Sequence, residues 1–214
     1  MFSCNMAYLI LVRHTKSKWN ALGLWQGWTD IELAPEGKEE ALRTAEALRG
    51  LEINSVHTSL LRRAKETWNI IRDALKISPL TVEHQALNER HYGIYQGKNK
   101  WEIQKQVGEE EFKKIRRSWD HPIPEGETLQ DVYKRIVPYY ENTILKELKE
   151  GKNVVVVAHG NSLRALVKYL EHLSIEEVLN LEFGIGEVYI YEVDSEGKIV
   201  SKEIRAANPK LGKI

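Results

Sequence analysis

The sequence predicts a three-layer α/β/α sandwich around a mostly parallel central sheet. Short apolar runs bounded by turns alternate along the chain with segments of helical periodicity, which is typical of this class. Two runs, residues 7–14 and 154–158, are so apolar that both are expected to form buried strands. The 214 residues fit a single domain, residues 1–214, with room for a full core.

The other elements follow from the apolar pattern and the turn residues. Further strands are expected at residues 53–58, 80–83, 187–193 and 199–205, the last two as paired edge strands. Ser59, Thr128 and Ser174 are expected to cap helices, and Pro138 to kink the helix that follows Thr128. Apart from the segments that these caps begin, helices are expected at residues 35–49, 98–120 in two pieces separated near Gly108, and 161–170.

A histidine follows each of the two most apolar strands. Arg13-His14 ends the first, and His159-Gly160-Asn161 follows the second. Ligands of open α/β sheets bind beyond the carboxyl ends of the strands, so both histidines are expected in one site. An imidazole nitrogen can attack phosphorus while a neighbouring guanidinium neutralises the phosphoryl oxygens. The matched positions favour phosphoryl chemistry over two unrelated buried histidines.

Other charged residues have two interpretations each. Glu89 lies between polar loops and could face a pocket as an acid–base group, or it could form a surface pair with Arg90. Arg63 begins a helix, where anions are favoured. Three further basic residues would lie on solvated faces unless the fold brings them together: Lys100, Arg116 and Arg117.

Composition limits the function classes. Lys plus Arg and Asp plus Glu both number 31, so the formal net charge is +0, which argues against a nucleic-acid or membrane-surface binder. The single cysteine, Cys4, allows no internal disulfide and fits a reducing compartment. The first residues lack a signal-peptide pattern, and no apolar run reaches the roughly 18 to 20 residues of a membrane span. Neither strand-end histidine has a metal ligand at suitable spacing. We expect a cytoplasmic protein without a metal.

The motifs combine into a family resemblance that covers nearly the whole chain in order. They lie at residues 11–14, 17–20, 26–28, 58–64, 87–93, 96–100, 116–117, 127–129 and 158–166. Together they resemble the cofactor-dependent phosphoglycerate mutases of the histidine phosphatase superfamily. The resemblance implies that fold and the interconversion of 3-phosphoglycerate and 2-phosphoglycerate in glycolysis and gluconeogenesis. It also implies priming by 2,3-bisphosphoglycerate, no metal, and small phosphorylated three-carbon acids as substrates of a monomer or small homo-oligomer.

The resemblance also implies residue roles. His14 would be the nucleophile that becomes phosphohistidine, and Glu89 the proton donor and acceptor. The transferring phosphoryl group would be held by Arg13, Arg63 and His159, with help from Asn20 and Gly160 and with Asn161 nearby. The substrate would meet Gln26 and Gly27, and its second phosphate or carboxylate would be bound by Arg90, Tyr92, Lys100, Arg116 and Arg117.

Three departures from the family pattern raise an alternative. Thr15-Lys16 stands where the family usually has Gly-Glu, and Gln26 where it has Ser or Thr, as in the phosphatases of the superfamily. An insertion before Glu127 is absent, and the chain ends soon after Arg205, where family members carry a tail over the site. We therefore expect a mutase that loses some phosphate to water. The alternatives are a phosphomonoesterase on the same scaffold and, more distantly, a non-catalytic phospholigand-binding module.

Overall fold

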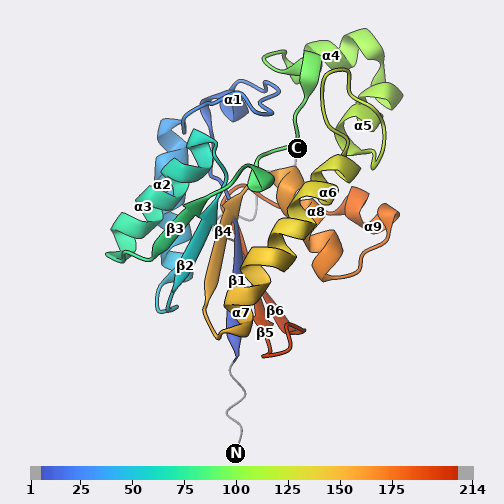
Figure 1. Cartoon of the computed structure of the whole chain (residues 1–214). Helices are drawn as coiled ribbons and strands as arrows, with labels where there is room; N and C mark the ends of the chain where they lie inside the picture. The colour runs from blue at the N-terminus through green and yellow to red at the C-terminus, as the bar shows by residue number, and fades with distance from the viewer. Residues whose placement is uncertain (1–5, 207–214) are drawn as a thin grey trace, which may run out of the picture.

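A computed structural model describes residues 6–206 of the chain. The expectations on Cys4, on the first residues and on the C-terminal tail lie outside these described residues. Six strands form one sheet in the order β3-β2-β4-β1-β5-β6 (Figure 1). The strands are β1 Ala7–Arg13, β2 Ser55–Thr58, β3 Leu80–Glu83, β4 Val154–Ala158, β5 Glu187–Val193 and β6 Ile199–Ala206.

The sheet is mostly parallel, as the sequence predicts. Strands β1 to β4 run in one direction, β5 is antiparallel to β1, and β6 is antiparallel to β5. One detail of the prediction is wrong, because β5 is not an edge strand. Residues 7–12 of β1 pair with residues 188–193 of β5, so β5 lies inside the sheet and only β6 ends it on that side.

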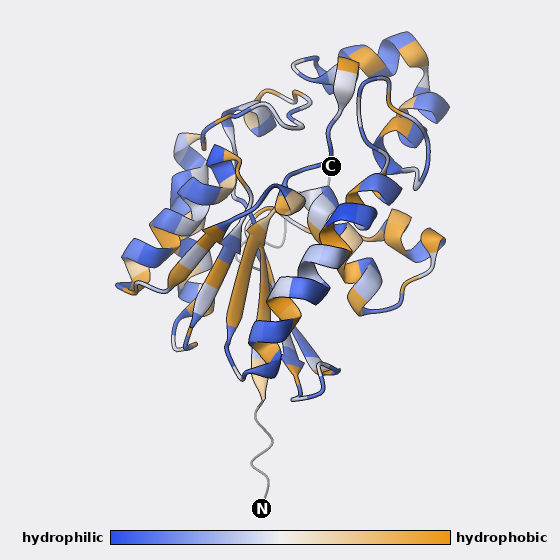
Figure 2. Ribbon diagram, in the orientation of Figure 1, coloured by the Kyte–Doolittle hydropathy of each residue, from blue (hydrophilic) through white to orange (hydrophobic). Residues whose placement is uncertain are grey.

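Helices cover both faces of the sheet (Figure 1). Alternate residues of β1 therefore pack against different helices. Leu9 and Leu11 face a core that includes α6 and α8, whereas Ile10 and Val12 face a core that includes α2 and α3. The central strands β1 and β4 are accordingly almost wholly apolar, whereas the edge strands β3 and β6 carry exposed polar side chains, and the helices are polar on their outer faces (Figure 2). The helices are α1 Lys18–Ala21, α2 Pro35–Leu48, α3 Arg62–Leu75, α4 Lys100–Val107, α5 Glu109–Arg117, α6 Leu129–Tyr139, α7 Leu145–Lys149, α8 Gly160–Leu170 and α9 Ile175–Asn180. The three-layer prediction is confirmed.

Two of the three expected helix caps are confirmed. Thr128 caps α6 and Ser174 caps α9, each within a capping box. Ser59 does not cap α3, which begins at Arg62 without a side-chain cap. The Ser59 hydroxyl instead accepts from the Leu61 N–H and contacts His159, because the chain turns toward the strand ends before the helix begins.

The helix that contains Pro138 does not keep regular α geometry to its end. After α6 the chain forms a π-helical turn, η3 Tyr140–Ile144, and then α7. Short 3₁₀ turns lie at η1 Gln85–Leu87 and η2 Gly93–Tyr95. The sequence did not predict α1, a single turn capped by Ser17.

A small apolar cluster lies apart from the two main cores. It joins Trp25 and Tyr92 to the inner faces of α4 and α5, where Ile103, Phe112 and Ile115 are buried. Figure 1 shows α4 and α5 beyond the carboxyl ends of the central strands. The cluster therefore holds the basic residues of these two helices over the end of the sheet from which His14 and His159 emerge.

Candidate active site

The two strand-end histidines lie side by side. Strands β1 and β4 pair in parallel with Arg13 opposite Ala158. The residues that follow these two strands, His14 and His159, therefore leave the sheet at the same level. The His14 N–H continues the ladder by donating to the Ala158 carbonyl at 2.9 Å. The imidazole centroids are 4.9 Å apart and both side chains are buried. The sheet register itself creates this pair.

The His14 ring has the electronic form that a nucleophile needs. Its Nδ1 lies 2.7 Å from the Thr15 carbonyl, and because a carbonyl can only accept, Nδ1 carries the proton. The lone pair is therefore on Nε2. Burial, followed by the nearby charges of Arg63 and Arg13, lowers the pKa of His14 well below its usual value, so the ring stays neutral at physiological pH.

His159 begins α8 as its N-cap residue and is also neutral. Burial is the largest cause of its lowered pKa, and the positive charge of Arg63 is the second. Its Nε2 lies 2.7 Å from the Ser59 hydroxyl, whereas its buried Nδ1 has no hydrogen-bond partner among the described residues. A buried nitrogen without a partner is costly, so this atom is suited to a ligand.

Arg13 and Arg63 are fixed by main-chain carbonyls. Arg13 donates from Nη1 to the Phe183 carbonyl at 2.5 Å, and Arg63 donates to the carbonyls of Gly27 and Thr29 at 2.8 and 3.1 Å. In both guanidinium groups Nε is buried and has no partner within the described part of the chain. Burial lowers the pKa of Arg63 to about 10, so it remains charged near neutral pH.

Gly27 shapes the loop that Arg63 holds. Its φ is +51°, and a Cβ there would lie 1.9 Å from the Gln96 Oε1 atom. A side chain would therefore strain the backbone and displace the Gln96 side chain. Beside it, Gln26 accepts a hydrogen bond from the Ser17 hydroxyl at 2.6 Å. Lys16, next to the nucleophile in sequence, is not part of the pocket wall, and its N–H donates to Glu40.

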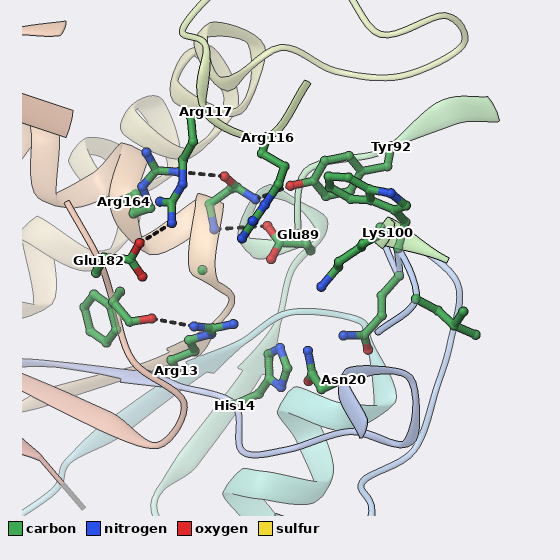
Figure 3. Close-up of a pocket in the computed structure, with 17 residues that line it drawn as sticks. Arg13, His14, Asn20, Glu89, Tyr92, Lys100, Arg116, Arg117, Arg164 and Glu182 are labelled. Carbon is green, nitrogen blue, oxygen red and sulfur yellow. Dashed lines mark hydrogen bonds and ion pairs between the residues drawn. The ribbon is translucent and has the colours of Figure 1, made fainter. Parts of the chain in front are cut away.

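The carboxylate of Glu89 is held by main-chain donors from two segments. Its Oε1 accepts from the N–H groups of Arg90 at 2.8 Å and Asn161 at 3.1 Å. The Glu89 carbonyl accepts from the Trp28 indole at 2.6 Å and from the Arg135 guanidinium at 3.0 Å. Glu89 and His14 line the same pocket (Figure 3), so the acid–base candidate and the nucleophile face one space.

The far side of that pocket is basic. Lys100 begins α4, and Arg116 and Arg117 end α5, and all three line the pocket with Tyr92 (Figure 3). Burial, then repulsion from Arg116, lowers the pKa of Lys100 to about 8. The Tyr92 hydroxyl accepts from the Asn161 side chain at 2.9 Å, which connects this side to the start of α8.

Most of the predicted site residues line this one pocket. They are Arg13, His14, Asn20, Gln26, Gly27, Glu89, Tyr92, Lys100, Arg116, Arg117, Gly160 and Asn161. His159 and Arg63 are not in its lining, although one contacts the His14 ring and the other lowers the His14 pKa.

Arg90 is not in the lining either. It is fully buried and donates to the carbonyls of Glu127 at 2.6 Å and Ile115 at 3.0 Å, with its guanidinium 5.2 Å from the Tyr92 ring centre. In the structure Arg90 supports Tyr92 from below the pocket surface. Its expected contact with substrate stays a prediction.

The pocket also contains residues that the sequence analysis did not select. Arg164 donates to the Asn161 side chain at 3.0 Å, one helical turn earlier on α8. This i, i+3 spacing places both residues on one helix face, a signal that was available in the sequence. Glu182 and Phe183, between α9 and β5, gave no comparable signal. Leu24 and Trp25 complete the wall.

The described residues contain no group of three or more His, Cys, Asp or Glu residues placed to hold a metal ion. Within residues 6–206 there is likewise no helix with the length and apolar character needed to cross a membrane.

Comparison with known proteins identifies the family. The model of the histidine phosphatase superfamily (branch 1) matches residues 9–204. The chain belongs to this superfamily. Its fold agrees, since the structure of YhfR from Bacillus stearothermophilus aligns with a TM-score of 0.79 at 30% identity, over 90% of this chain and 94% of that one. A mycobacterial glucosyl-3-phosphoglycerate phosphatase has a TM-score of 0.78 at 23% identity, over 94% and 98% of the two chains, and shares the fold.

Relatives of similar length carry one activity in their names. A protein of Nocardia farcinica named 2,3-bisphosphoglycerate-dependent phosphoglycerate mutase is 44% identical over 87% of this chain and 86% of its own. The Schizosaccharomyces pombe protein named phosphoglycerate mutase is 41% identical over 92% and 94%.

Proposed function

We propose that this protein is a 2,3-bisphosphoglycerate-dependent phosphoglycerate mutase that interconverts 3-phosphoglycerate and 2-phosphoglycerate. One observation carries the proposal. A single pocket is lined on one side by a neutral histidine, a carboxylate and an arginine. Its other side is lined by a separate group of cations. Such a pocket can hold a small ligand with an anionic group at each end. The names of the relatives support the same reaction.

The phosphoryl side of the pocket performs the transfer. Nε2 of His14 attacks phosphorus, and Arg13 stabilises the charge on the equatorial oxygens. Because His14 Nδ1 donates to the Thr15 carbonyl, the ring keeps its orientation when its other nitrogen is phosphorylated. Two nearby buried nitrogens that have no hydrogen-bond partner within residues 6–206, Nε of Arg13 and Nδ1 of His159, are available to the same oxygens. Arg13 and Arg63 supply the positive field without a metal.

Glu89 moves the proton. When a substrate hydroxyl accepts the phosphoryl group, a carboxylate can remove its proton, and it can return the proton when the oxygen leaves. The two main-chain N–H groups on Glu89 Oε1 fix that oxygen, which leaves Oε2 for the substrate. The carboxylate serves whichever hydroxyl faces His14, as an interconversion of two positional isomers requires.

The residues of the pocket fit 2,3-bisphosphoglycerate, which supplies the phosphoryl group that primes His14. The fit rests on cations at both ends, with Arg13 at one and Lys100, Arg116 and Arg117 at the other. Buried Nε atoms of Arg13 and Arg164 lack hydrogen-bond partners within residues 6–206, and an anion would satisfy them.

The test is an assay with 3-phosphoglycerate and catalytic 2,3-bisphosphoglycerate that follows both 2-phosphoglycerate and free phosphate. We expect mutase turnover to exceed phosphate release at saturating substrate, because the distal cations hold the acceptor in line. We also expect phosphate release without 3-phosphoglycerate, because Gln26 replaces a small hydroxyl residue in the pocket wall. Phosphate release that equals or exceeds 2-phosphoglycerate formation would establish the phosphomonoesterase. Binding without a phosphorylated enzyme would indicate the binding module.

The setting of this activity is also part of the proposal. We infer a single catalytic domain that acts in the cytoplasm on free phosphorylated acids, as a monomer or small homo-oligomer. The neutral net charge and the confined basic pocket support a small polyanion as ligand rather than a nucleic acid. Size-exclusion chromatography with light scattering measures the oligomeric state.

A further inference from the structure

The pocket wall contains a second carboxylate, Glu182, for which the phosphoryl chemistry has no use. Glu89 provides the proton transfer and is fixed by two main-chain N–H groups. The Glu182 carboxylate contacts Arg117 Nη2 (Figure 3). It therefore occupies a guanidinium that would otherwise face an anionic ligand. A carboxylate at the cationic end of the pocket repels an anionic ligand, so its presence there calls for a functional explanation.

The charge of Glu182 acts on arginines beyond its partner Arg117. Its negative charge raises the pKa of Arg13, Arg116 and Arg164, against the larger effect of burial in each case. A ligand anion in the same place would have the same effect on these groups. Glu182 thus resembles, in charge and in partner, the distal anionic group of a bound ligand.

The neighbouring residue binds the other end of the site. The carbonyl of Phe183 accepts from Arg13 Nη1 at 2.5 Å. Two consecutive residues between α9 and β5 therefore hold one arginine beside His14 and another at the distal end. This segment keeps both arginines in place when the pocket contains no ligand.

We propose that Glu182 is a specificity-determining residue that competes with the distal anionic group of the ligand for Arg117. A ligand with a phosphate and a second anionic group must displace Glu182 or share Arg117 with it. A ligand with a phosphate alone does not need Arg117 and is not affected. Glu182 therefore weakens the hold on doubly anionic ligands, which eases release and lets a bound ligand turn within the pocket.

The displaced carboxylate has somewhere to go. Arg117 and Glu182 also line a second hollow between α5 and α9, outside the catalytic pocket, whose wall includes Lys113 and Lys114. The ion pair therefore lies in the partition between the two spaces. A rotation of the Glu182 side chain outward places it in a hollow that is open to water and whose wall contains the carboxylates of Glu110 and Glu176 as well as the two lysines, so displacement does not bury an unpaired charge.

The test measures binding without turnover, in a His14→Asn background that cannot accept phosphate. Isothermal titration compares 3-phosphoglycerate with glycerol 3-phosphate, which has the same carbon chain but no carboxylate. Glu182→Gln is expected to lower the Kd of 3-phosphoglycerate about fivefold, the scale of an ion pair that is partly screened by water, and to leave that of glycerol 3-phosphate unchanged. The side chains of Arg117 and Glu182 are 24% and 32% exposed, which limits the effect to this size.

Two controls separate competition from bulk charge. Glu176→Gln removes the same charge from the outer hollow and is expected to change neither Kd. With Arg117→Gln already present, Glu182→Gln is expected to have no further effect on 3-phosphoglycerate, because the contested partner is gone. Equal tightening of both ligands by Glu182→Gln, weaker binding of 3-phosphoglycerate, or no binding to any variant would overturn the proposal.

The choice of ligands rests on the proposed function, but the two ideas can fail separately. If the unsubstituted chain does not convert 3-phosphoglycerate to 2-phosphoglycerate, the mutase proposal fails while the titrations still report on Glu182. If the chain is a mutase and Glu182→Gln does not discriminate between the two ligands, only the inference on Glu182 fails.

Discussion

The two sides of the pocket are built in different ways. His14 and His159 leave paired strands that are largely buried between the two main cores, so the sheet register fixes their positions. Lys100, Arg116 and Arg117 belong to α4 and α5, which a small separate cluster supports over the strand ends. One side is therefore rigid and suited to chemistry, where small displacements are costly. The other depends on a few packed side chains and is suited to binding and discrimination.

Removing the nucleophile tests the rigid side and should have the largest effect. His14→Asn is expected to abolish phosphoenzyme formation and to reduce kcat by on the order of 10⁴-fold or more, since no other group takes over the attack. Acid-labile, base-stable phosphate on the protein is measured after incubation with 2,3-bisphosphoglycerate. His172→Asn, the same change at an exposed histidine, is the control. Phosphate mapped to His159 would contradict the assignment of roles to the pair.

Removing the distal cations tests the other side. Arg116→Ala with Arg117→Ala is expected to raise the KM for 3-phosphoglycerate at least about 100-fold, because two charged hydrogen-bond donors to the ligand are lost. Phosphorylation of His14 by a small donor such as phosphoramidate should change little. Steady-state kinetics and the rate of phosphoenzyme formation measure the two effects.

The matched control for that double variant is Lys113→Ala with Lys114→Ala. It removes the same charge from the same helix, at residues that line the outer hollow rather than the catalytic pocket. A KM that rises equally in both double variants would indicate a long-range field instead of a binding site, and would remove the distinction between the two sides.

The difference between the sides also explains what the sequence could predict. The strands that carry His14 and His159 are nearly continuous apolar runs, so their existence and end points follow from local pattern. The distal residues read locally as an ordinary basic helix, because their meeting depends on how α4 and α5 pack on Trp25 and Tyr92. Only the family resemblance suggested their role.

Local pattern failed where a residue has tertiary partners. Ser59 has the side chain of a helix cap, but its hydroxyl contacts His159 on a neighbouring strand end. Edge position was also not readable, since β5 and β6 have similar lengths and only the pairing of β5 with β1 places it inside the sheet. Glu182 lies in a turn segment without periodicity, so nothing local indicated that its carboxylate would meet Arg117.

The pH dependence of binding gives a sharper test of the distal side. Lys100 has a pKa of about 8, so it is charged below this value and neutral above it. The affinity of the free enzyme for an anion should therefore fall as pH rises through about 8, by up to about tenfold for the loss of one charged partner. Isothermal titration with 3-phosphoglycerate between pH 7 and 9.5 measures this fall in affinity.

Lys100→Arg should move this fall in affinity to higher pH, because a guanidinium stays charged in this range. Lys98→Arg, nearby but outside the catalytic pocket, should leave it in place. If the affinity of Lys100→Arg falls at the same pH as before, another group titrates, and the burial of Lys100 does not control binding.

The smallest expected effect concerns stability and belongs to the rigid side. Burial and nearby cations lower the pKa of His14 and of His159 in the folded state below the ordinary value of 6.5 that applies when the chain is unfolded. As pH falls below 6.5, the unfolded state binds protons that the folded state does not, so the free energy of unfolding decreases. Each histidine contributes a slope of up to about 1.4 kcal/mol per pH unit, while above 6.5 neither contributes.

Denaturant unfolding between pH 7.5 and 5 measures this slope. His159→Asn should reduce it by about one histidine's share. An unchanged slope in His159→Asn would mean that the folded protein admits a proton at this side, and the contrast between a closed phosphoryl end and an adaptable distal end would not hold.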